Sequence, residues 1–354
     1  MKRDIISIVE NSKVTHPIVT AAIAGKRYWC DFLKVIENYK GILTEQDYLN
    51  LLDKSKLDCE IDMAQYLQFA SEVTIVDYII RNYEGFKNEP RYNGKKNPEC
   101  SFEYGGRTIN VEVKCPNMSK RIKQENLGGI KLFASERFPN KDSYTQAEEI
   151  IKSTIKDAQN VHSINRLDNK LKDYLKSAHE KFPSSSISYF NILVVALDII
   201  QDMDEWYSYL LGDKGAFTDK TYIEDDYSNV DAVLITNVQH GHMADNVDLS
   251  INCWKLENYV SLLILDPRKE QIEGLGEYYF QTALDLFGGL TRDFLKFQFY
   301  MDRKNDIRSS HIKYLSLNEN QATALNHMLY IGDKFTDLQI VSKWVETLKK
   351  PDVK

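Results

Sequence analysis

Two glutamates and one lysine, held on a short stretch of chain, are the residues of this sequence best suited to chemistry. Asn97-Pro98-Glu99 is followed, thirteen positions after Glu99, by Glu112-Val113-Lys114. Paired carboxylates can bind a hard divalent cation, and a neighbouring ammonium group can neutralise charge that develops on a phosphoryl oxygen. The combination predicts a site that holds a divalent metal ion against a phosphodiester.

The residues between the two glutamates predict a β-hairpin that positions them. A strand is followed by Gly105-Gly106, a favourable turn, and then by a second strand. The second strand alternates between two faces, with Ile109, Val111 and Val113 on one and Asn110, Glu112 and Lys114 on the other. Residues on one face are roughly 6.6 Å apart, so Glu112 and Lys114 can reach one phosphate, and the turn brings Glu99 close to Glu112. The alternative is an exposed hairpin whose Glu and Lys form a surface charge pair, worth a few tenths of a kcal/mol.

Elements on both sides of the hairpin must build the sheet around it. The apolar patterns predict a helix over 63–83, a strand over 86–91, a loop over 116–140, helices over 146–162 and 167–182, and strands over 189–197, 231–236 and 260–265. The helix over 63–83 should end near Gly85. The run over 189–197 suits a strand buried on both faces. From residue 63 to 197 the order is therefore helix, strand, strand, strand, helix, strand.

The motif and this order of elements together resemble the PD-(D/E)XK nuclease superfamily, which has the restriction-endonuclease-like fold. Pro98-Glu99 and Glu112-Val113-Lys114, flanked by apolar residues, carry the resemblance. Here Glu99 stands where the family more often has Asp. The resemblance covers 63–197, and it implies an α/β fold: an αβββαβ core with a mixed central sheet, extended by helical N- and C-terminal regions. The expected division is 1–60 (helical), 61–265 (nuclease-like core with extra strands) and 266–354 (helical).

The resemblance also implies roles for individual residues. Glu99 and Glu112 would bind Mg²⁺, or Mn²⁺ in its place, with the backbone carbonyl of Val113 as a third ligand. Lys114 would orient or polarise the attacking water, or neutralise developing charge. The family often adds a glutamate from the first core helix, for which Glu72 is the candidate; the alternative is an exposed glutamate on the helix surface. Lys152 and Gln159, on the helix after the motif, are weaker candidates for a polar residue facing the site.

Charge is distributed unevenly along the chain. The whole sequence has a formal net charge of −7, whereas residues 91–131 carry nine basic and four acidic side chains, a local +5 that leaves −12 for the remainder. The basic residues are Arg91, Lys95, Lys96, Arg107, Lys114, Lys120, Arg121, Lys123 and Lys131. Lys120, Arg121 and Lys123 follow the motif closely and suit phosphate contacts in nucleic acid. The alternative is a solvated basic loop.

Other features limit the compartment and the competing chemistries. Five scattered cysteines without a CxxC pattern, the lack of a signal peptide and the lack of any apolar run near ~18 residues predict a reduced, cytoplasmic protein outside the membrane. His240 and His242, near Asp245 and Asp248, more often mark a polar loop than a metal site. The glycines do not form a nucleotide-binding pattern.

These observations favour a cytoplasmic, Mg²⁺-dependent endonuclease that hydrolyses phosphodiester bonds in DNA, of the restriction or phage-defence type by analogy. The N- and C-terminal helical regions would supply substrate recognition, regulation or assembly into a homodimer. Two alternatives stay open. The same fold could act as a nucleic-acid-binding or scaffold module without catalysis, or the hairpin could be incidental in a helical interaction protein.

Overall fold

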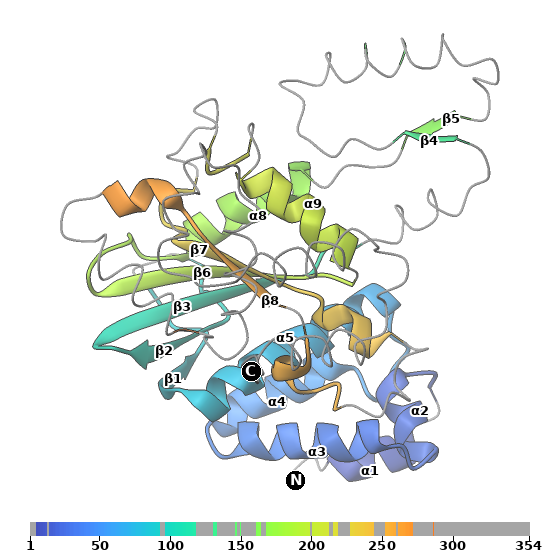
Figure 1. Ribbon diagram of the computed structural model, residues 1–354. Helices are drawn as coiled ribbons and strands as arrows, with labels where there is room; N and C mark the ends of the chain where they lie inside the picture. Colours follow the sequence, from blue (N-terminus) through green and yellow to red (C-terminus); the bar gives the residue numbers. More distant parts are fainter. Residues whose placement is uncertain are drawn as a thin grey trace, which may run out of the picture.

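The computed structural model of the protein describes residues 5–12, 14–92, 96–117, 130–132, 146, 149, 161–163, 168–198, 200–211, 215–218, 227–243, 252–259, 261–271 and 286. These residues form an α/β fold in which helices lie on both sides of a six-stranded mixed sheet (Figure 1). The coarse prediction of an α/β protein with a mixed central sheet is confirmed.

The sheet has the strand order β1-β2-β3-β6-β7-β8. Its strands are β1 (Glu84–Asn88), β2 (Cys100–Tyr104), β3 (Arg107–Lys114), β6 (Tyr189–Ala196), β7 (Ala232–Thr236) and β8 (Ser261–Leu265). Strands β1, β2 and β3 are antiparallel, β3, β6 and β7 run parallel, and β8 is antiparallel to β7. A separate two-stranded sheet pairs β4 (Ile130–Leu132) with β5 (Val161–Ser163).

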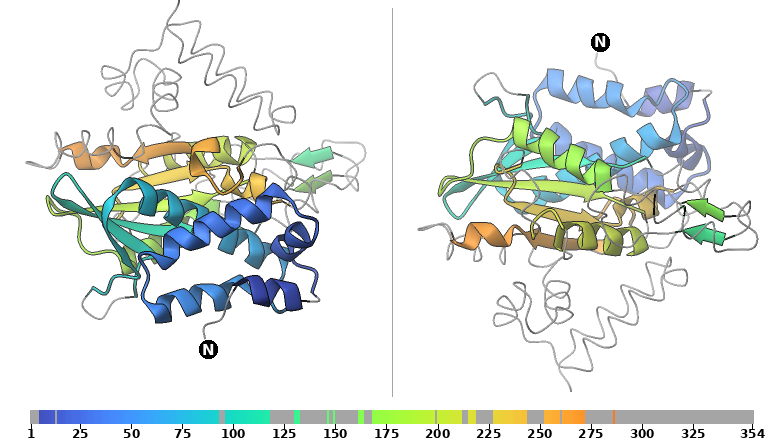
Figure 2. Two further views of the ribbon diagram at one scale, coloured as in Figure 1. Left: turned by 90° about the horizontal axis from the view of Figure 1, so that it is seen from below. Right: turned by 90° about the horizontal axis from the view of Figure 1, so that it is seen from above.

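Helices cover the two faces of the large sheet unequally. The N-terminal helices are α1 (Ile5–Asn11), α2 (Pro17–Ile23), α3 (Arg27–Lys40), α4 (Glu45–Ser55) and α5 (Met63–Asn82). On the opposite face lie α8 (Asp168–Lys181) and α9 (Ile200–Leu211). The views from below and above show the same two helical layers (Figure 2). Short 3-10 helices follow the later strands: η3 (Val238–His242), η5 (Leu256–Asn258) and η6 (Pro267–Gln271).

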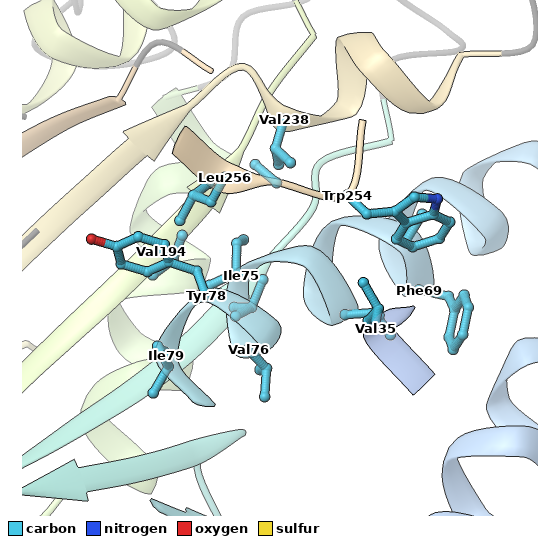
Figure 3. Packing of buried hydrophobic residues seen from close by; sticks show 14 of the residues in the cluster. Val35, Phe69, Ile75, Val76, Tyr78, Ile79, Val194, Val238, Trp254 and Leu256 are labelled. Carbon is cyan, nitrogen blue, oxygen red and sulfur yellow. The ribbon is translucent and has the colours of Figure 1, made fainter. Parts of the chain in front are cut away.

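Two apolar cores form because successive strand residues point to opposite faces of the sheet. Val111 on β3 and Val194 on β6 pack into the core beneath α1–α5, whereas Leu193 and Val195 on β6 pack beneath α8 and α9. The first core extends from Ile5 through helices α3 and α5 to the sheet. Figure 3 shows part of it, including Val35, Phe69 and Trp254. The N-terminal 60 residues therefore share one core with the sheet.

Several predicted elements agree closely with the structure. Helix α5 matches the expected helix over 63–83, and β6 matches the strand expected over 189–197. The hairpin closes as predicted, because Tyr104 pairs with Arg107 across Gly105 and Gly106, whose φ angles are 57° and 76°. Positive φ at both turn residues costs glycine little, and it matches the twist of the two strands.

Other expectations differ from the structure or fall outside it. The strand expected over 86–91 is β1, which begins earlier, at Glu84, and ends at Asn88. Most of the helix expected over 146–162 lies outside the described residues, but Val161 and His162 at its end belong to β5, where β-branched Val161 pairs with Ile130. Helix α9 was not predicted. Of the C-terminal region 266–354, the structure describes only 266–271 and Leu286. Within the described residues, no helix is both long and apolar enough to cross a membrane.

Candidate active site

Glu99 and Glu112 lie side by side at one end of the hairpin. Cys100 pairs with Val111 in the antiparallel ladder, so Glu99, which directly precedes Cys100, reaches the level of Glu112. Glu112 alternates with the core valines of β3 and points to the face beneath α8. Its side chain is 0 % exposed and that of Glu99 is 19 % exposed. A buried carboxylate is costly unless charged partners surround it.

Two lysines supply these partners for Glu112. The Nζ of Lys114 lies 2.7 Å from Glu112 Oε1, and the Nζ of Lys181 lies 2.6 Å from the same oxygen. Lys181 also lies 4.0 Å from Glu99 Oε1 and therefore bridges the two glutamates. The other oxygen, Glu112 Oε2, is buried and has no hydrogen-bond partner among the described residues. The site thus concentrates positive charge on one oxygen and leaves the other without a donor.

Lys181 is the site residue that the sequence did not reveal. It is the last residue of α8 and follows β3 by a long stretch of chain. Locally it is one of several lysines on a charged helix that ends before Pro183, so neither spacing nor composition marks it. Only the packing of α8 over β3 brings its ammonium group to Glu112.

Glu72 approaches the same place from the opposite face of the sheet. It is carried by α5, and a hydrogen bond joins its side chain to that of Glu99. Lys54, from α4, has its Nζ 3.6 Å from Glu72 Oε1 and 3.2 Å from Glu89 Oε1. Glu72 is 21 % exposed, so it is partly buried beside Glu99 and is not the fully exposed helix-surface glutamate of the alternative.

The pKa of Glu99 reflects this crowding. Burial, followed by the charge of Glu72 and the hydrogen bond to it, raises the pKa of Glu99 to about 7, while Lys181 and Lys54 lower it. Two carboxyl groups in contact disfavour double ionisation. Near pH 7, Glu99 is therefore protonated in part of the molecules, and a bound cation would displace this proton.

The cluster lies at the carboxyl end of β3, where the parallel strands β3, β6 and β7 terminate together. In open α/β sheets this edge is a frequent place for ligands. Cys115, directly after Lys114, accepts a hydrogen bond of 2.8 Å from Gln239 Nε2, which also donates to Ala196 O at 2.6 Å. Burial raises the pKa of the Cys115 thiol to about 12, so this cysteine stays protonated and is unsuited to act as a nucleophile.

The remaining predicted residues are not brought into this cluster by the described structure. The side chain of Val113 is buried in the first core, and the role of its carbonyl stays a prediction. Lys120, Arg121, Lys123, Lys152 and Gln159 all lie outside the described residues.

The two histidines of η3 are buried and point to separate partners. His242 Nδ1 lies 2.7 Å from Tyr28 OH and its Nε2 lies 2.9 Å from Thr74 Oγ1. His240 Nδ1 lies 2.9 Å from Asp198 Oδ1. The expectation of a polar loop is therefore wrong, because η3 packs both rings against α5 and β6 neighbours. In the part of the chain that the structure describes, no group of three or more His, Cys, Asp and Glu side chains is arranged to hold a metal ion.

Comparison with protein-family models, with curated proteins and with solved structures finds no significant match. The function of this protein is therefore inferred from the geometry of the site and from the resemblance of its motif to that of the PD-(D/E)XK superfamily.

Proposed function

We propose that this protein is a metal-dependent nuclease that hydrolyses phosphodiester bonds in DNA. The observation that carries the proposal is that Glu99 and Glu112 lie at one end of β3, where Lys114 pairs with Glu112 and Lys181 lies within 4.0 Å of both glutamates. Paired carboxylates that can hold a cation, with a lysine beside them, are the groups that phosphodiester hydrolysis needs.

The arrangement of elements supports the same proposal. When the separate small sheet of β4 and β5 is set aside, the order α5-β1-β2-β3-α8-β6 agrees with the helix, strand, strand, strand, helix, strand order that the resemblance implies. The three antiparallel strands β1, β2 and β3 are followed by β6, which is parallel to β3. Glu99 lies directly before the second strand and Glu112 near the end of the third, and the resemblance leads us to expect the metal-binding acids on these two strands.

The donor set fits a hard cation. Carboxylate oxygens are the ligands that Mg²⁺ and Mn²⁺ prefer, and Glu99 and Glu112 would hold the ion together with the Val113 carbonyl. The buried Glu112 Oε2, without a hydrogen-bond partner among the described residues, is the oxygen that most needs a positive partner. When bound, the ion supplies a water of lowered pKa and neutralises charge on the phosphoryl group.

The chain's own residues have separate tasks in this proposal. Glu112 and Glu99 would hold the cation, and Glu72, through its hydrogen bond, orients Glu99. Lys114, 2.7 Å from Glu112, orients the attacking water or stabilises charge on a non-bridging oxygen. A fixed charge of this kind contributes about 10²–10³ in rate.

Cleavage of plasmid DNA in Mg²⁺ or Mn²⁺ tests the proposal. The native protein should cut, and Glu112→Ala and Lys114→Ala should each lose about two orders of magnitude or more in rate. Glu103→Ala is the matched control, because Glu103 is an exposed carboxylate on the same hairpin, with Thr108 as its hydrogen-bond partner. Equal cleavage by native protein, Glu112→Ala and Lys114→Ala would remove this site from consideration.

A second candidate function is a nucleic-acid-binding or scaffold module without catalysis. It is favoured by the two ammonium groups that already occupy Glu112 Oε1. Calorimetric titration distinguishes the two functions. DNA binding without any uptake of Mg²⁺ or Mn²⁺ at millimolar concentration would favour the module, whereas metal uptake lost in Glu112→Ala would favour the nuclease.

A further inference from the structure

Lys181 has a geometry that a simple counter-ion of Glu112 does not require. Glu112 Oε1 already forms an ion pair with Lys114 at 2.7 Å, so Lys181, which also lies 4.0 Å from Glu99 Oε1, is shared between two carboxylates. Lys181 places a second ammonium group 2.6 Å from the same oxygen, and its side chain is only 15 % exposed. Because the Lys181 ammonium group lies against both glutamates and its side chain keeps some exposure, it is placed to meet an anion that approaches them.

The backbone around Lys181 is held in place independently of its ammonium group. Leu171, Leu175 and Ala178 bury the apolar stripe of α8 in the second core, and Phe182 directly after Lys181 is also buried there. Asn191 on β6 donates a hydrogen bond of 2.9 Å to Pro183 O. Because these contacts fix the end of α8, the lysine is presented to the site on a rigid support, as a substrate-contacting group needs.

We propose that Lys181 is a second substrate-contacting lysine of this site, and that its ammonium group binds a non-bridging oxygen of the phosphodiester that lies against Glu99 and Glu112. The inference rests on the proposed nuclease function. In this arrangement, the phosphate is held by Lys114 at the end of β3 and by Lys181 at the end of α8. The substrate is thereby assigned to anionic phosphodiesters, which enter the site from the carboxyl end of β3.

The test compares K181M, K181R and K172M with the native protein. Lys172 is exposed on the same helix, so K172M removes the same charge away from the site. In Mg²⁺, we expect K181M to lose about 100-fold in single-turnover cleavage of DNA, and K181R, which keeps a fixed cation, to stay within about 10-fold of the native rate. K172M should cut at the native rate.

A second readout is independent of metal and of catalysis. Binding of a labelled DNA duplex is measured in EDTA over a range of salt concentrations. K181M, which loses one phosphate contact, should have a slope of log K against log salt that is less steep by about 0.9. K172M should have the slope of the native protein.

The outcomes separate the two proposals. Cleavage by the native protein, with K181M equal to K172M in rate and slope, would show that Lys181 is only a counter-ion and would overturn the inference. A slower K181M with an unchanged slope would overturn it as well, because a structural role produces that result. A reduced slope in a protein that cuts no DNA would keep the phosphate contact and reject the nuclease function.

Discussion

Asn110 on β3 donates a hydrogen bond of 2.8 Å to Asn191 Oδ1 on the neighbouring strand β6, and both side chains are fully buried. Asn191 in turn donates to Pro183 O and, at 2.7 Å, to Asn229 O. The pair therefore ties the chain that leaves α8 to the strand that carries Glu112. Its two amide groups set how the end of α8, and with it Lys181, lies over the sheet.

Replacing Asn191 by Ala should therefore destabilise the fold and weaken the site. The change leaves Asn110 Nδ2, Pro183 O and Asn229 O without this partner, and buried unsatisfied groups cost about 1–3 kcal/mol each. We expect a loss of about 3 kcal/mol in the free energy of unfolding, measured by urea denaturation. Asn82→Ala is the control, since Asn82 is exposed and its side chain donates a hydrogen bond to Tyr78 O; a change there should stay within about 0.5 kcal/mol. Equal losses for both variants would contradict the role given to Asn191.

Glu72→Gln should lower the pKa of Glu99. The charge and hydrogen bond of Glu72 help burial to raise that pKa to about 7 from its ordinary 4.5, and glutamine removes the charge while Lys181 and Lys54 remain. The midpoint of the Glu99 titration, followed by carbon NMR of the side-chain carboxyl group without metal, should move toward 4.5. Glu103→Gln, on the exposed part of β2, should leave it unchanged. A midpoint that stays near 7 in Glu72→Gln would show that burial alone sets it.

The sign of the accompanying stability change follows from linkage. Because the pKa of Glu99 is raised in the folded protein, the folded state binds a proton between pH 7 and 4.5 that the unfolded state does not bind. This group therefore stabilises the fold as the pH falls through that window. In Glu72→Gln this stabilisation on acidification should be smaller, as urea denaturation at pH 7 and pH 5 would report.

Much of the hairpin and its motif could be predicted because the information is local. Alternation of apolar residues along β3, two glycines at the turn and the spacing from Glu99 to Glu112 fix the register within one short segment. Helix α5 is likewise marked by the apolar pattern of its own residues. The physical causes of these features all lie within a few residues of one another.

The rest of the site depends on packing between distant segments. Lys181 reaches Glu112 only because α8 covers the second core, and Lys54 reaches Glu72 only because α4 packs beside α5. An apolar pattern predicts that a helix buries one face, but it does not determine the sheet residues on which that face lies. The same reason explains why His242 was expected in a polar loop: its partners, Tyr28 and Thr74, come from two helices far earlier in the chain.

Acid should destabilise the protein through His242. Burial lowers the pKa of His242 to about 3, from its ordinary 6.5, so the folded state stays neutral while the unfolded state takes up a proton below pH 6.5. This group therefore leaves the free energy of unfolding unchanged above pH 6.5. Below pH 6.5 it lowers the free energy of unfolding by about 1.4 kcal/mol per pH unit, until the pKa of the folded state is reached. Between pH 7 and pH 5 the contribution of this group to unfolding amounts to about 2 kcal/mol.

The measurement is the difference between the native protein and His242→Gln in urea denaturation at pH 7 and pH 5. Glutamine can still form hydrogen bonds to Tyr28 and Thr74 but does not titrate. On acidification, the free energy of unfolding of His242→Gln should therefore fall about 2 kcal/mol less than that of the native protein. His16, whose pKa burial lowers to about 4, is unchanged in both proteins and cancels in the difference. An identical pH dependence for the two proteins would contradict the neutral, buried state of His242.

The ion pair of Glu112 with Lys181 should show a strong interaction energy in a double-mutant cycle. Glu112→Gln leaves the ammonium groups of Lys114 and Lys181 close together without the buried charge that holds them, and removing one partner of a buried pair costs about 3–5 kcal/mol. Adding Lys181→Met to Glu112→Gln removes the surplus cation, so the double variant should recover about 1–3 kcal/mol relative to the sum of the single changes. Urea denaturation without metal of the native protein, the two single variants and the double variant measures this interaction energy. The control combines Glu112→Gln with Lys172→Met, which changes an exposed lysine of the same helix, and its losses should be strictly additive. Additivity in the first cycle would mean that Lys181 does not depend on the charge of Glu112, and the 2.6 Å contact between them would contribute little to the stability of the fold.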